Sequence, residues 1–279
     1  MSSPRVGTLY LVSTPIGNLG DMTYRAVEIL SSVALVIAED TRHSRRLLDH
    51  YKVTTPVSSY HEHNEAREAP RLVARLCAGD SIALISDAGT PLISDPGSRL
   101  VTSALEAGVP VVPVPGASSV MAALVASGMA LDRFTFFGFL PRKGRDRNER
   151  LAEIAASRST VAIFEAANRV ASTLDDLAAA GAGDRQAVVA RELTKRFEEF
   201  KRGSVAELAA ACGASEPKGE VVLLLAGAEK REVTERELTE AAKDVRASGG
   251  DPREVMDHLV TALGAPRNLA YKIAHRGEA

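Results

Sequence analysis

The chain has 279 residues, enough for about two domains that each bury a substantial core. Hydrophobic residues make up 45% and charged residues 25%, a composition typical of a globular protein, which argues against a disordered chain. The formal net charge of −2 excludes attachment to nucleic acid through overall charge, so an RNA site would have to be a local basic patch. Cys77 and Cys212 lie in apolar, helix-like sequence, and we expect buried, reduced thiols.

The sequence indicates no contact with membranes. No apolar run approaches the roughly 20 residues that span a bilayer. Residues 1–7 lack the hydrophobic core of a secretory signal. We therefore expect a cytoplasmic protein with no membrane partner.

Short β-rich apolar runs alternate with helical patterns along most of the chain, which is typical of a layered α/β protein. Strands are predicted at residues 8–13, 33–38, 81–86, 109–114, 134–139, 160–164, 187–191 and 220–226. Helices are predicted at residues 25–30, 65–77, 98–107, 118–127, 147–156 and 170–180. From residue 232 to residue 276 only two or three helices are expected, broken at Gly249-Gly250 and Gly264. We predict an N-terminal α/β domain at 1–116, a C-terminal α/β domain at 117–229 and a helical tail at 230–279.

Residues 86–97 leave the carboxyl end of a predicted strand, the edge at which open α/β sheets bind ligands. Gly89 and Gly97 would let the backbone come close to a ligand, and Asp87 and Asp95 could accept hydrogen bonds from hydroxyl or ammonium groups. By composition alone, a plain loop with turn residues and an aspartate N-cap explains the segment equally well. The sequence has neither a P-loop nor a G-x-G-x-x-G after a strand, which favours a ligand without phosphates.

Four segments together resemble the tetrapyrrole methylase family: TPIGNL at 14–19, AEDTR at 38–42, SDAGTPLISDPG at 86–97 and PVPGASS at 113–119. The match runs in order from about residue 7 to residue 227. Within the family, the sequence is most similar to members that methylate the 2′-oxygen of a cytidine in small-subunit ribosomal RNA, and RNLAYK at 267–272 resembles their helical tail. The resemblance implies a two-domain class III methyltransferase fold with a small C-terminal helical appendage.

The resemblance also implies S-adenosylmethionine as the cofactor, folded into a cleft that the C-terminal α/β domain closes, and the usual homodimer of the family. The cofactor-binding residues that it implies are Pro15, Gly17, Asp87, Ala88, Gly89, Ile93, Asp95, Pro96, Ser118 and Ser119. The sequence departs from the family at residues 164–169, where FEAANR stands in place of YEAPHR. No role of the family's histidine can therefore be carried over to this chain.

Methyl transfer from a sulfonium is an in-line displacement, so the protein mainly aligns the acceptor oxygen and excludes water. A ribose hydroxyl is a weak nucleophile near neutral pH, so a nearby base or cation would help. The candidate catalytic residues are Asp40, Arg42, Glu165 and Lys195. Asp40 and Arg42 could instead cap a helix and pair at the surface, and Glu165 could form a structural i,i+4 ion pair with Arg169. The sequence does not identify the base.

A basic stretch at residues 141–147 is the candidate RNA-binding segment, although such a charge run is often only a solvated face. Its cations are Arg142, Lys143, Arg145 and Arg147, and Arg42, Arg45 and Arg46 could extend the surface. Tyr60 and Phe197 are the nearest aromatic candidates for base stacking. His61 and His63 lack the H-E-x-x-H spacing of zinc proteases, so we expect substrate contact there and no metal site.

These inferences predict S-adenosylmethionine-dependent 2′-O-methylation of a cytidine in the decoding region of 16S ribosomal RNA, with small-subunit RNA or the 30S particle as partner. One alternative is a methylase of the same fold that acts on a tetrapyrrole or a protein. The arginine-rich loop and the helical tail argue against it. The other is a non-catalytic, ribosome-associated RNA-binding module, for which a glycine-lined cleft would have no use.

Overall fold

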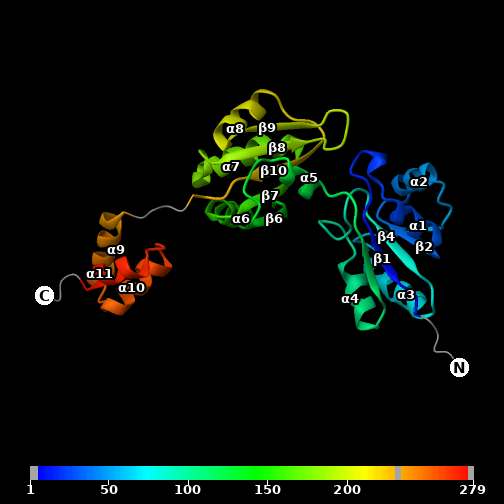
Figure 1. Cartoon of the computed structure of the whole chain (residues 1–279), viewed down its shortest axis with the longest axis horizontal. Helices are drawn as coiled ribbons and strands as arrows, with labels where there is room; N and C mark the ends of the chain where they lie inside the picture. The colour runs from blue at the N-terminus through cyan, green and yellow to red at the C-terminus, as the bar shows by residue number, and fades with distance from the viewer. Residues whose placement is uncertain (1–5, 230–233, 276–279) are drawn as a thin grey trace. The chain divides into compact units, whose positions relative to one another are not determined.

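A computed structural model describes residues 6–229 and 234–275 (Figure 1). The chain divides into two compact units, Met1–Ala228 and Glu229–Ala279. Each unit has hydrophobic clusters of its own, built entirely from its own side chains. The predicted boundary between residues 116 and 117 falls inside the first unit, and the division of that unit into two domains stays a prediction.

The first sheet of the larger unit is parallel throughout, with strand order β3-β2-β4-β1-β5. Its strands are β1 (Leu9–Val12), β2 (Leu35–Ala38), β3 (Val57–Ser59), β4 (Ile82–Ile85) and β5 (Val111–Val114). Parallel neighbours need long crossovers, and here helices are part of them. These helices are α1 (Tyr24–Ser32), α2 (Thr41–His50), α3 (Glu65–Cys77) and α4 (Ser98–Glu106). Buried side chains of α1 and α2 join one core and those of α3 and α4 another, so helices cover both faces of the sheet.

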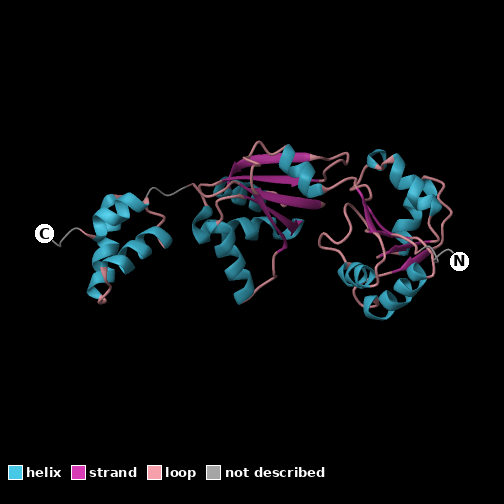
Figure 2. Cartoon of the chain, turned by 60° about the horizontal axis from the view of Figure 1, so that its bottom comes forward, coloured by secondary structure: helices cyan, strands magenta, loops and turns pink. Residues whose placement is uncertain are grey.

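The second sheet is mixed, with strand order β6-β7-β10-β8-β9. Figure 2 shows the strands of the larger unit in magenta with helices packed against them. Its strands are β6 (Phe134–Phe139), β7 (Thr160–Ala166), β8 (Gln186–Arg191), β9 (Glu199–Ser204) and β10 (Glu220–Leu225). Only β6 and β7 run parallel, and the other neighbours are antiparallel. The accompanying helices are α5 (Ser119–Val125), α6 (Arg145–Ala156), α7 (Val170–Leu177) and α8 (Val205–Ala214). Helices α6, α7 and α8 pack on one face of this sheet and α5 on the other, together with Ile16 and Leu193.

The second unit consists of three helices, α9 (Glu235–Ala247), α10 (Pro252–Thr261) and α11 (Arg267–Ala274). Capping boxes start α9 at Thr234 and α10 at Asp251. The helices end near Gly249 and Gly264, both at positive φ, as the sequence predicts. The outermost predicted residues, 232 and 276, lie outside the described part of the chain.

The expected fold class, an α/β protein with a C-terminal helical appendage, is confirmed. The structure differs from the predictions in four elements and in the exposure of one cysteine. The predicted ranges omit α2, β3, α8 and β9, although the helix-like sequence around Cys212 already indicated α8. The prediction that both cysteines are buried is wrong for Cys77, which is exposed on the last turn of α3, while Cys212 is buried. Within the described residues, no helix is both long and apolar enough to cross a bilayer.

Candidate active site

Two bends far apart in the sequence are bonded to each other at the carboxyl end of the parallel sheet. The Thr14 N–H donates to the Gly89 carbonyl at 2.9 Å, and the Gly89 N–H donates to the Thr14 carbonyl at 3.0 Å. The Thr14 hydroxyl also donates to the Ser86 carbonyl at 3.2 Å. The bends meet because β1 and β4 pair in parallel, which brings Val12 beside Ile85. The two segments that the sequence predicts to share a site are therefore neighbours.

A pocket of about 400 Å³ opens at these bends, with walls from both sheets of the larger unit. Such a volume suits a small-molecule ligand. Seven of the expected cofactor-binding residues line it: Asp87, Ala88, Gly89, Ile93, Asp95, Ser118 and Ser119. Ser118 also has a structural task, because its hydroxyl accepts the Met121 N–H and caps α5.

Three expected residues, Pro15, Gly17 and Pro96, do not belong to the described wall of this pocket, although Ile16 does. Gly17 is constrained by the side chain of Lys195, which passes close to its backbone. Its φ is +146°, and a Cβ there would lie 2.4 Å from Cγ of Lys195. The glycine therefore leaves space for the lysine side chain to cross the first bend. Whether any of these residues binds cofactor stays a prediction.

The pocket is strongly acidic. Five carboxylate side chains line it, and among the described wall residues there is neither lysine nor arginine. The five are Glu39, Asp87, Asp95, Glu165 and Glu220. Burial, together with repulsion from Glu39 and Asp87, raises the pKa of Asp95 to about 6. Such a wall repels a phosphate-bearing ligand and attracts a cationic one.

Two strained loops present apolar side chains to the pocket. Leu92 and Ser94 have φ of 71° and 67°, and Ile93 between them lines the pocket. Glu192 and Thr194 have φ of 50° and 65°, and Leu193 between them lines the pocket as well. Non-glycine residues in the left-handed region are uncommon, and such strain clusters at functional sites. The only other described case is Lys52, away from the pocket wall.

Lys195, one of the candidate catalytic residues, lies beside the pocket wall in an ion-pair cluster. Its Nζ lies 2.9 Å from Oε1 of Glu192 and 3.0 Å from Oε2 of Glu220. Partial burial lowers the pKa of Lys195, but hydrogen bonds to the two carboxylates outweigh burial and the net shift is upward. Lys195 is therefore a protonated cation and not a base.

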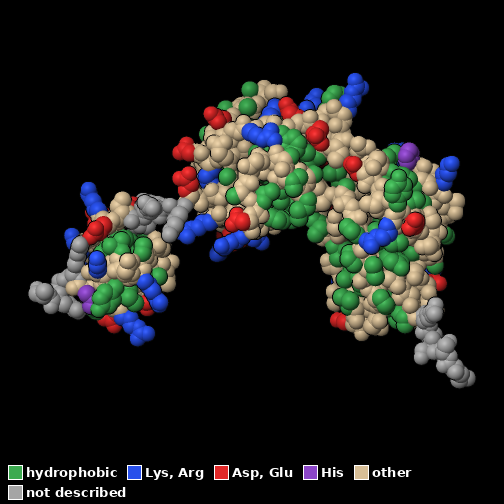
Figure 3. Space-filling model, in the orientation of Figure 1, with side chains coloured by type: hydrophobic (Ala, Val, Ile, Leu, Met, Phe, Trp, Pro, Cys, Tyr) green, Lys and Arg blue, Asp and Glu red, His purple; other side chains and the backbone are tan. Residues whose placement is uncertain are grey.

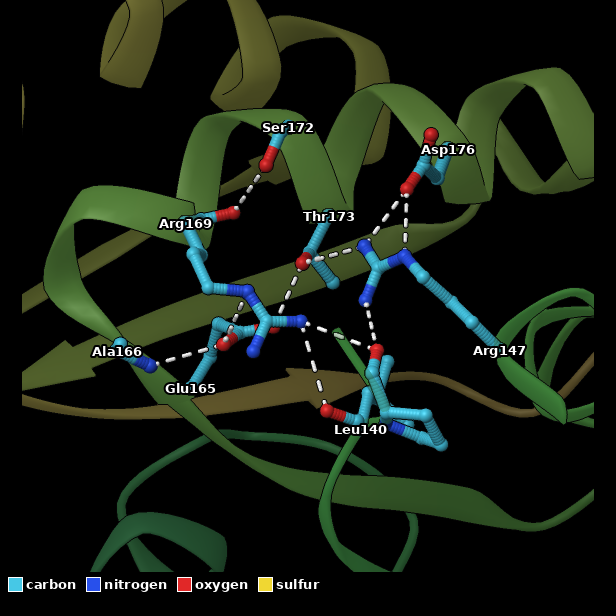
Figure 4. A network of polar contacts seen from close by, with 9 residues as sticks. Leu140, Arg147, Glu165, Ala166, Arg169, Ser172, Thr173 and Asp176 are labelled. Atoms are coloured by element: carbon cyan, nitrogen blue, oxygen red, sulfur yellow. Dashed lines mark hydrogen bonds and ion pairs between the residues drawn. The ribbon is translucent and has the colours of Figure 1, made fainter. Parts of the chain in front are cut away.

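Glu165 is buried, and its carboxylate is fully engaged (Figure 4). Its Oε2 accepts the Thr173 hydroxyl at 2.6 Å, and its Oε1 accepts the Ala166 N–H at 2.9 Å. Arg169 Nε lies 3.5 Å from the same Oε1, the ion pair that the i,i+4 spacing indicates. Glu165 reaches the pocket wall, but both of its oxygens already accept hydrogen bonds from the protein.

The sequence left open whether Asp40 and Arg42 are catalytic or instead cap a helix and pair at the surface. The structure shows the capping and pairing geometry. The Asp40 carboxylate accepts the N–H groups of Arg42 at 2.8 Å and His43 at 3.4 Å, which caps α2. These hydrogen bonds lower the pKa of Asp40. The Arg42 side chain is 90% exposed and lies 3.6 Å from Asp40. The Asp40 N–H donates to the Asp87 carboxylate at 3.2 Å, which joins the start of α2 to the pocket.

The basic segment at 141–147 separates into exposed and buried cations. Arg142 and Lys143 are exposed, and Arg145 pairs with Glu149 at 2.6 Å. Arg147, which was expected on the surface, is instead buried, and its guanidinium donates to Asp176 at 2.6 Å. It also donates to the Thr173 hydroxyl and the Pro141 carbonyl (Figure 4). A guanidinium held in this way is a poor candidate for phosphate contact.

Of the aromatic and histidine candidates, only Tyr60 needs correction. Tyr60 is fully buried in the core under α3 and α4, so it cannot stack on a base. Phe197 is exposed and lies under the Arg196 guanidinium. His61 and His63 lie at a turn, and their ring centroids are 6.0 Å apart. Substrate contact by either histidine stays a prediction.

One wall of the pocket is aromatic, which the sequence did not reveal. Phe139 is 60% exposed, lines the pocket and lies 5.4 Å, ring to ring, from Phe164. The register between β6 and β7 shifts between Phe136 and Phe139, where Gly138 has φ of +62°. Without this bulge, strand alternation would turn Phe139 to the opposite face from Phe136. A glycine inside a predicted strand was the signal for such a bulge.

Three comparisons place the chain among known proteins. A family model described as Tetrapyrrole (Corrin/Porphyrin) Methylases matches residues 8–209. A protein of Synechocystis named Ribosomal RNA small subunit methyltransferase I is 45% identical over 277 residues, covering 98% of this chain and 99% of that protein. A protein of the same name from Xylella fastidiosa is 48% identical over 275 residues, covering 97% and 99%.

Solved structures share the fold of the larger unit. Cobalt precorrin-4 methyltransferase matches with a TM-score of 0.60 and 21% identity, over 78% of this chain and 94% of that one. Uroporphyrin-III C-methyltransferase from Thermus thermophilus, solved with S-adenosylhomocysteine, matches with a TM-score of 0.57 and 20% identity, over 79% and 97%. At these identities the likeness shows the class III methyltransferase fold alone.

Proposed function

Because the chain belongs to the tetrapyrrole methylase family, we propose that it methylates the 2′-oxygen of a cytidine in the decoding region of 16S ribosomal RNA. It is a methyltransferase, and its cofactor is S-adenosylmethionine. The observation that carries the choice of acceptor is near full-length similarity to relatives named for small-subunit ribosomal RNA. Such a substrate, free or within the 30S particle, implies that the chain works in the cytoplasm.

The acidic pocket fits this cofactor. S-adenosylmethionine carries a sulfonium and an ammonium group and no phosphate. Of the five wall carboxylates, Glu39, Asp87 and Asp95 have no ion pair within the described residues and can face a cationic ligand. We assign cofactor binding to Asp87, Ala88, Gly89, Ile93, Asp95, Ser118 and Ser119. Pro15, Gly17 and Pro96 would act by shaping the bends that carry their neighbours. When bound, the cofactor supplies an activated methyl group.

The protein side of the reaction is positioning and charge. The chain has to hold the acceptor hydroxyl in line with the methyl group and keep water away. Lys195 would be the cation near the acceptor oxygen, where it would stabilise the charge left when the hydroxyl proton leaves. Glu165 would position the wall, because both of its oxygens already accept hydrogen bonds. Asp40 and Arg42 would act at the edge of the site, where α2 begins.

Methyl transfer with a labelled donor tests the proposal. The purified chain is offered small-subunit RNA, 30S particles and a uroporphyrin, and methylated ribose is mapped by mass spectrometry. We expect label on one cytidine ribose, and Asp87→Ala should abolish most of it. Asp80→Ala is the matched control, because Asp80 pairs with Arg75 and does not contribute to the described pocket wall. Label on the uroporphyrin alone would refute the RNA proposal, and failure to bind S-adenosylmethionine would favour a non-catalytic module.

We also propose that the chain forms the homodimer that its family implies. Hydrophobic side chains gather over α5 and β6 on the face that Figure 3 shows. The exposed members in this region are Met121, Val125, Leu131 and Phe134, and Val125 is 75% exposed. Contiguous exposed apolar surface of this kind is typical of protein interfaces. Val125→Asp should give a monomer by light scattering, and Leu105→Asp, at an exposed position on α4, should not.

A further inference from the structure

The acidic pocket poses an electrostatic difficulty for an RNA substrate. Each nucleotide carries a phosphate, and the carboxylates of the wall repel it. Ion pairs with Arg169 and Lys195 offset two of the five carboxylates. The other three, Glu39, Asp87 and Asp95, have no ion pair within the described residues. Cations outside the wall have to hold the RNA backbone. A useful cation lies within about 10 Å of the site, because screening at about 0.1 M salt removes more distant interactions.

Helix α2 begins beside the pocket wall and carries cations. Residues 41–52 contain three arginines and one lysine against a single aspartate. Glu39 lines the pocket, and α2 starts two residues later. A rise of about 1.5 Å per residue places Arg45 and Arg46 roughly 6 to 8 Å along the axis from Thr41.

The cations of α2 differ from those of α3 in having few partners. On α3, Arg71 pairs with Glu68 at 3.3 Å and Arg75 with Asp80 at 2.8 Å. On α2, Arg42 has one long contact to Asp40, and Arg45 and Arg46 are exposed with no ion pair or hydrogen bond in the described chain. Free arginines can engage a polyanion without first breaking an internal pair.

The composition of this face favours RNA over a protein partner. The buried side of α2 consists of Ser44, Leu47 and Leu48. The opposite side has no exposed apolar side chain: it carries Arg42, His43, Arg45, Arg46, Asp49 and His50. The core of a protein interface is apolar and poor in charge, whereas contacts to phosphates come from arginine and lysine.

We propose that the exposed face of α2 binds the phosphate backbone of the RNA that the chain methylates. The inference rests on the proposed function and adds a docking surface to it, separate from the loop at residues 142–145. Arg45 and Arg46 make the contacts, and the cap at Asp40 fixes the helix beside the pocket.

Salt dependence of RNA binding tests the proposal. The full chain and its Arg45→Ala/Arg46→Ala variant are titrated with small-subunit ribosomal RNA at several salt concentrations, with S-adenosylhomocysteine present. We expect the variant to bind about tenfold more weakly at about 0.1 M salt, with a log–log slope reduced by about 1.4 to 1.8 for two lost phosphate contacts. Its affinity for S-adenosylmethionine should match that of the wild type, since neither arginine lines the pocket. Arg45→Lys/Arg46→Lys should restore most of the slope, because a phosphate contact needs charge more than shape.

The double variant Arg71→Ala/Arg75→Ala on α3 is the matched control. Like the α2 variant, it removes two positive charges from a helix that covers the parallel sheet. A slope unchanged by the α2 variant, or lowered equally by the α3 control, would overturn the proposal. A wild-type chain that methylates this RNA while the α2 variant behaves normally would refute the docking surface alone. A wild-type chain that neither binds nor methylates the RNA would refute the proposed function together with the surface.

Discussion

At the scale of single residues, Asp95 gives the cofactor pocket a dependence on pH. Burial, with repulsion from Glu39 and Asp87, raises its pKa from 3.8 to about 6. The neutral acid is therefore favoured below about pH 6 and the carboxylate above it. A cationic donor binds the carboxylate better, so affinity for S-adenosylmethionine should rise by up to about tenfold from about pH 5 to about pH 7. Calorimetry at several pH values measures this rise.

Two controls isolate the contribution of Asp95. Asp95→Asn should bind with little dependence on pH over the same window. S-adenosylhomocysteine lacks the sulfonium charge and should respond less than the donor. In the protein without cofactor, raising the pH lowers the contribution of Asp95 to folding stability, the opposite of its effect on cofactor affinity. A raised folded pKa stabilises the fold below the unfolded value near 3.8, and this contribution is lost as pH rises through about 6. A flat affinity profile for the wild type would contradict the assignment.

Gly89 can be tested against a glycine with the same backbone conformation elsewhere. Gly89 has φ of +81° in the pocket wall, and a Cβ there would lie 3.3 Å from Cγ2 of Ile16. Gly108 has φ of +71° after α4, with nothing within 4 Å of its Cβ position. Both alanine variants should lose about 1 kcal/mol of unfolding free energy through backbone strain. Only Gly89→Ala should also weaken S-adenosylmethionine binding, by about tenfold or more, and equal weakening in both would argue against a pocket role.

Single residues also show which parts of the site the sequence could predict. The wall residues around Asp87 and Ser118 follow from strand ends and motif resemblance, since parallel strands bring their carboxyl ends to one edge. Phe139 could not be foreseen, because its direction depends on the bulge at Gly138, and strand alternation alone gives the opposite face. The burial of Arg147 depends on Thr173 and Asp176, which only the fold brings near it.

At the scale of elements, α6 and α7 are joined by the buried guanidinium of Arg147. Its side chain is 8% exposed and donates to Asp176, Thr173 and the carbonyl of Pro141. Arg147→Met keeps most of the volume but removes these hydrogen bonds. It should lower the unfolding free energy by about 2 kcal/mol, because water can solvate the half-exposed Asp176 once the guanidinium is gone. Arg145→Met, at a position 90% exposed, should change it by less than about 0.5 kcal/mol. Urea unfolding measures both, and equal losses would contradict a structural role for Arg147.

Two of the elements outside the predicted ranges, α2 and β9, have a weak apolar pattern. Only two leucines of α2 are hydrophobic, and β9, at the edge of its sheet, has the sequence EFKRGS. Edge strands and charged helices bury little, so hydrophobic periodicity hardly marks them. The strands β1, β2, β4 and β10 were predicted within two residues because they are almost continuously apolar, as strands covered on both faces must be.

At the scale of the whole molecule, the two units should be separable for cofactor binding. Every wall residue of the pocket lies between Ile16 and Val222, and the core of the second unit uses only its own side chains, from Leu238 to Ala274. A chain ending at Ala228 should therefore fold and bind S-adenosylmethionine with a Kd within about twofold of the full chain, because no contact in the pocket is removed. Calorimetry measures the Kd, and circular dichroism checks that the helices of the larger unit remain. A truncated chain that folds but binds the donor much more weakly would mean that the three-helix unit contributes to the cofactor site. A truncated chain that does not fold would mean that the larger unit depends on the three-helix unit for its stability.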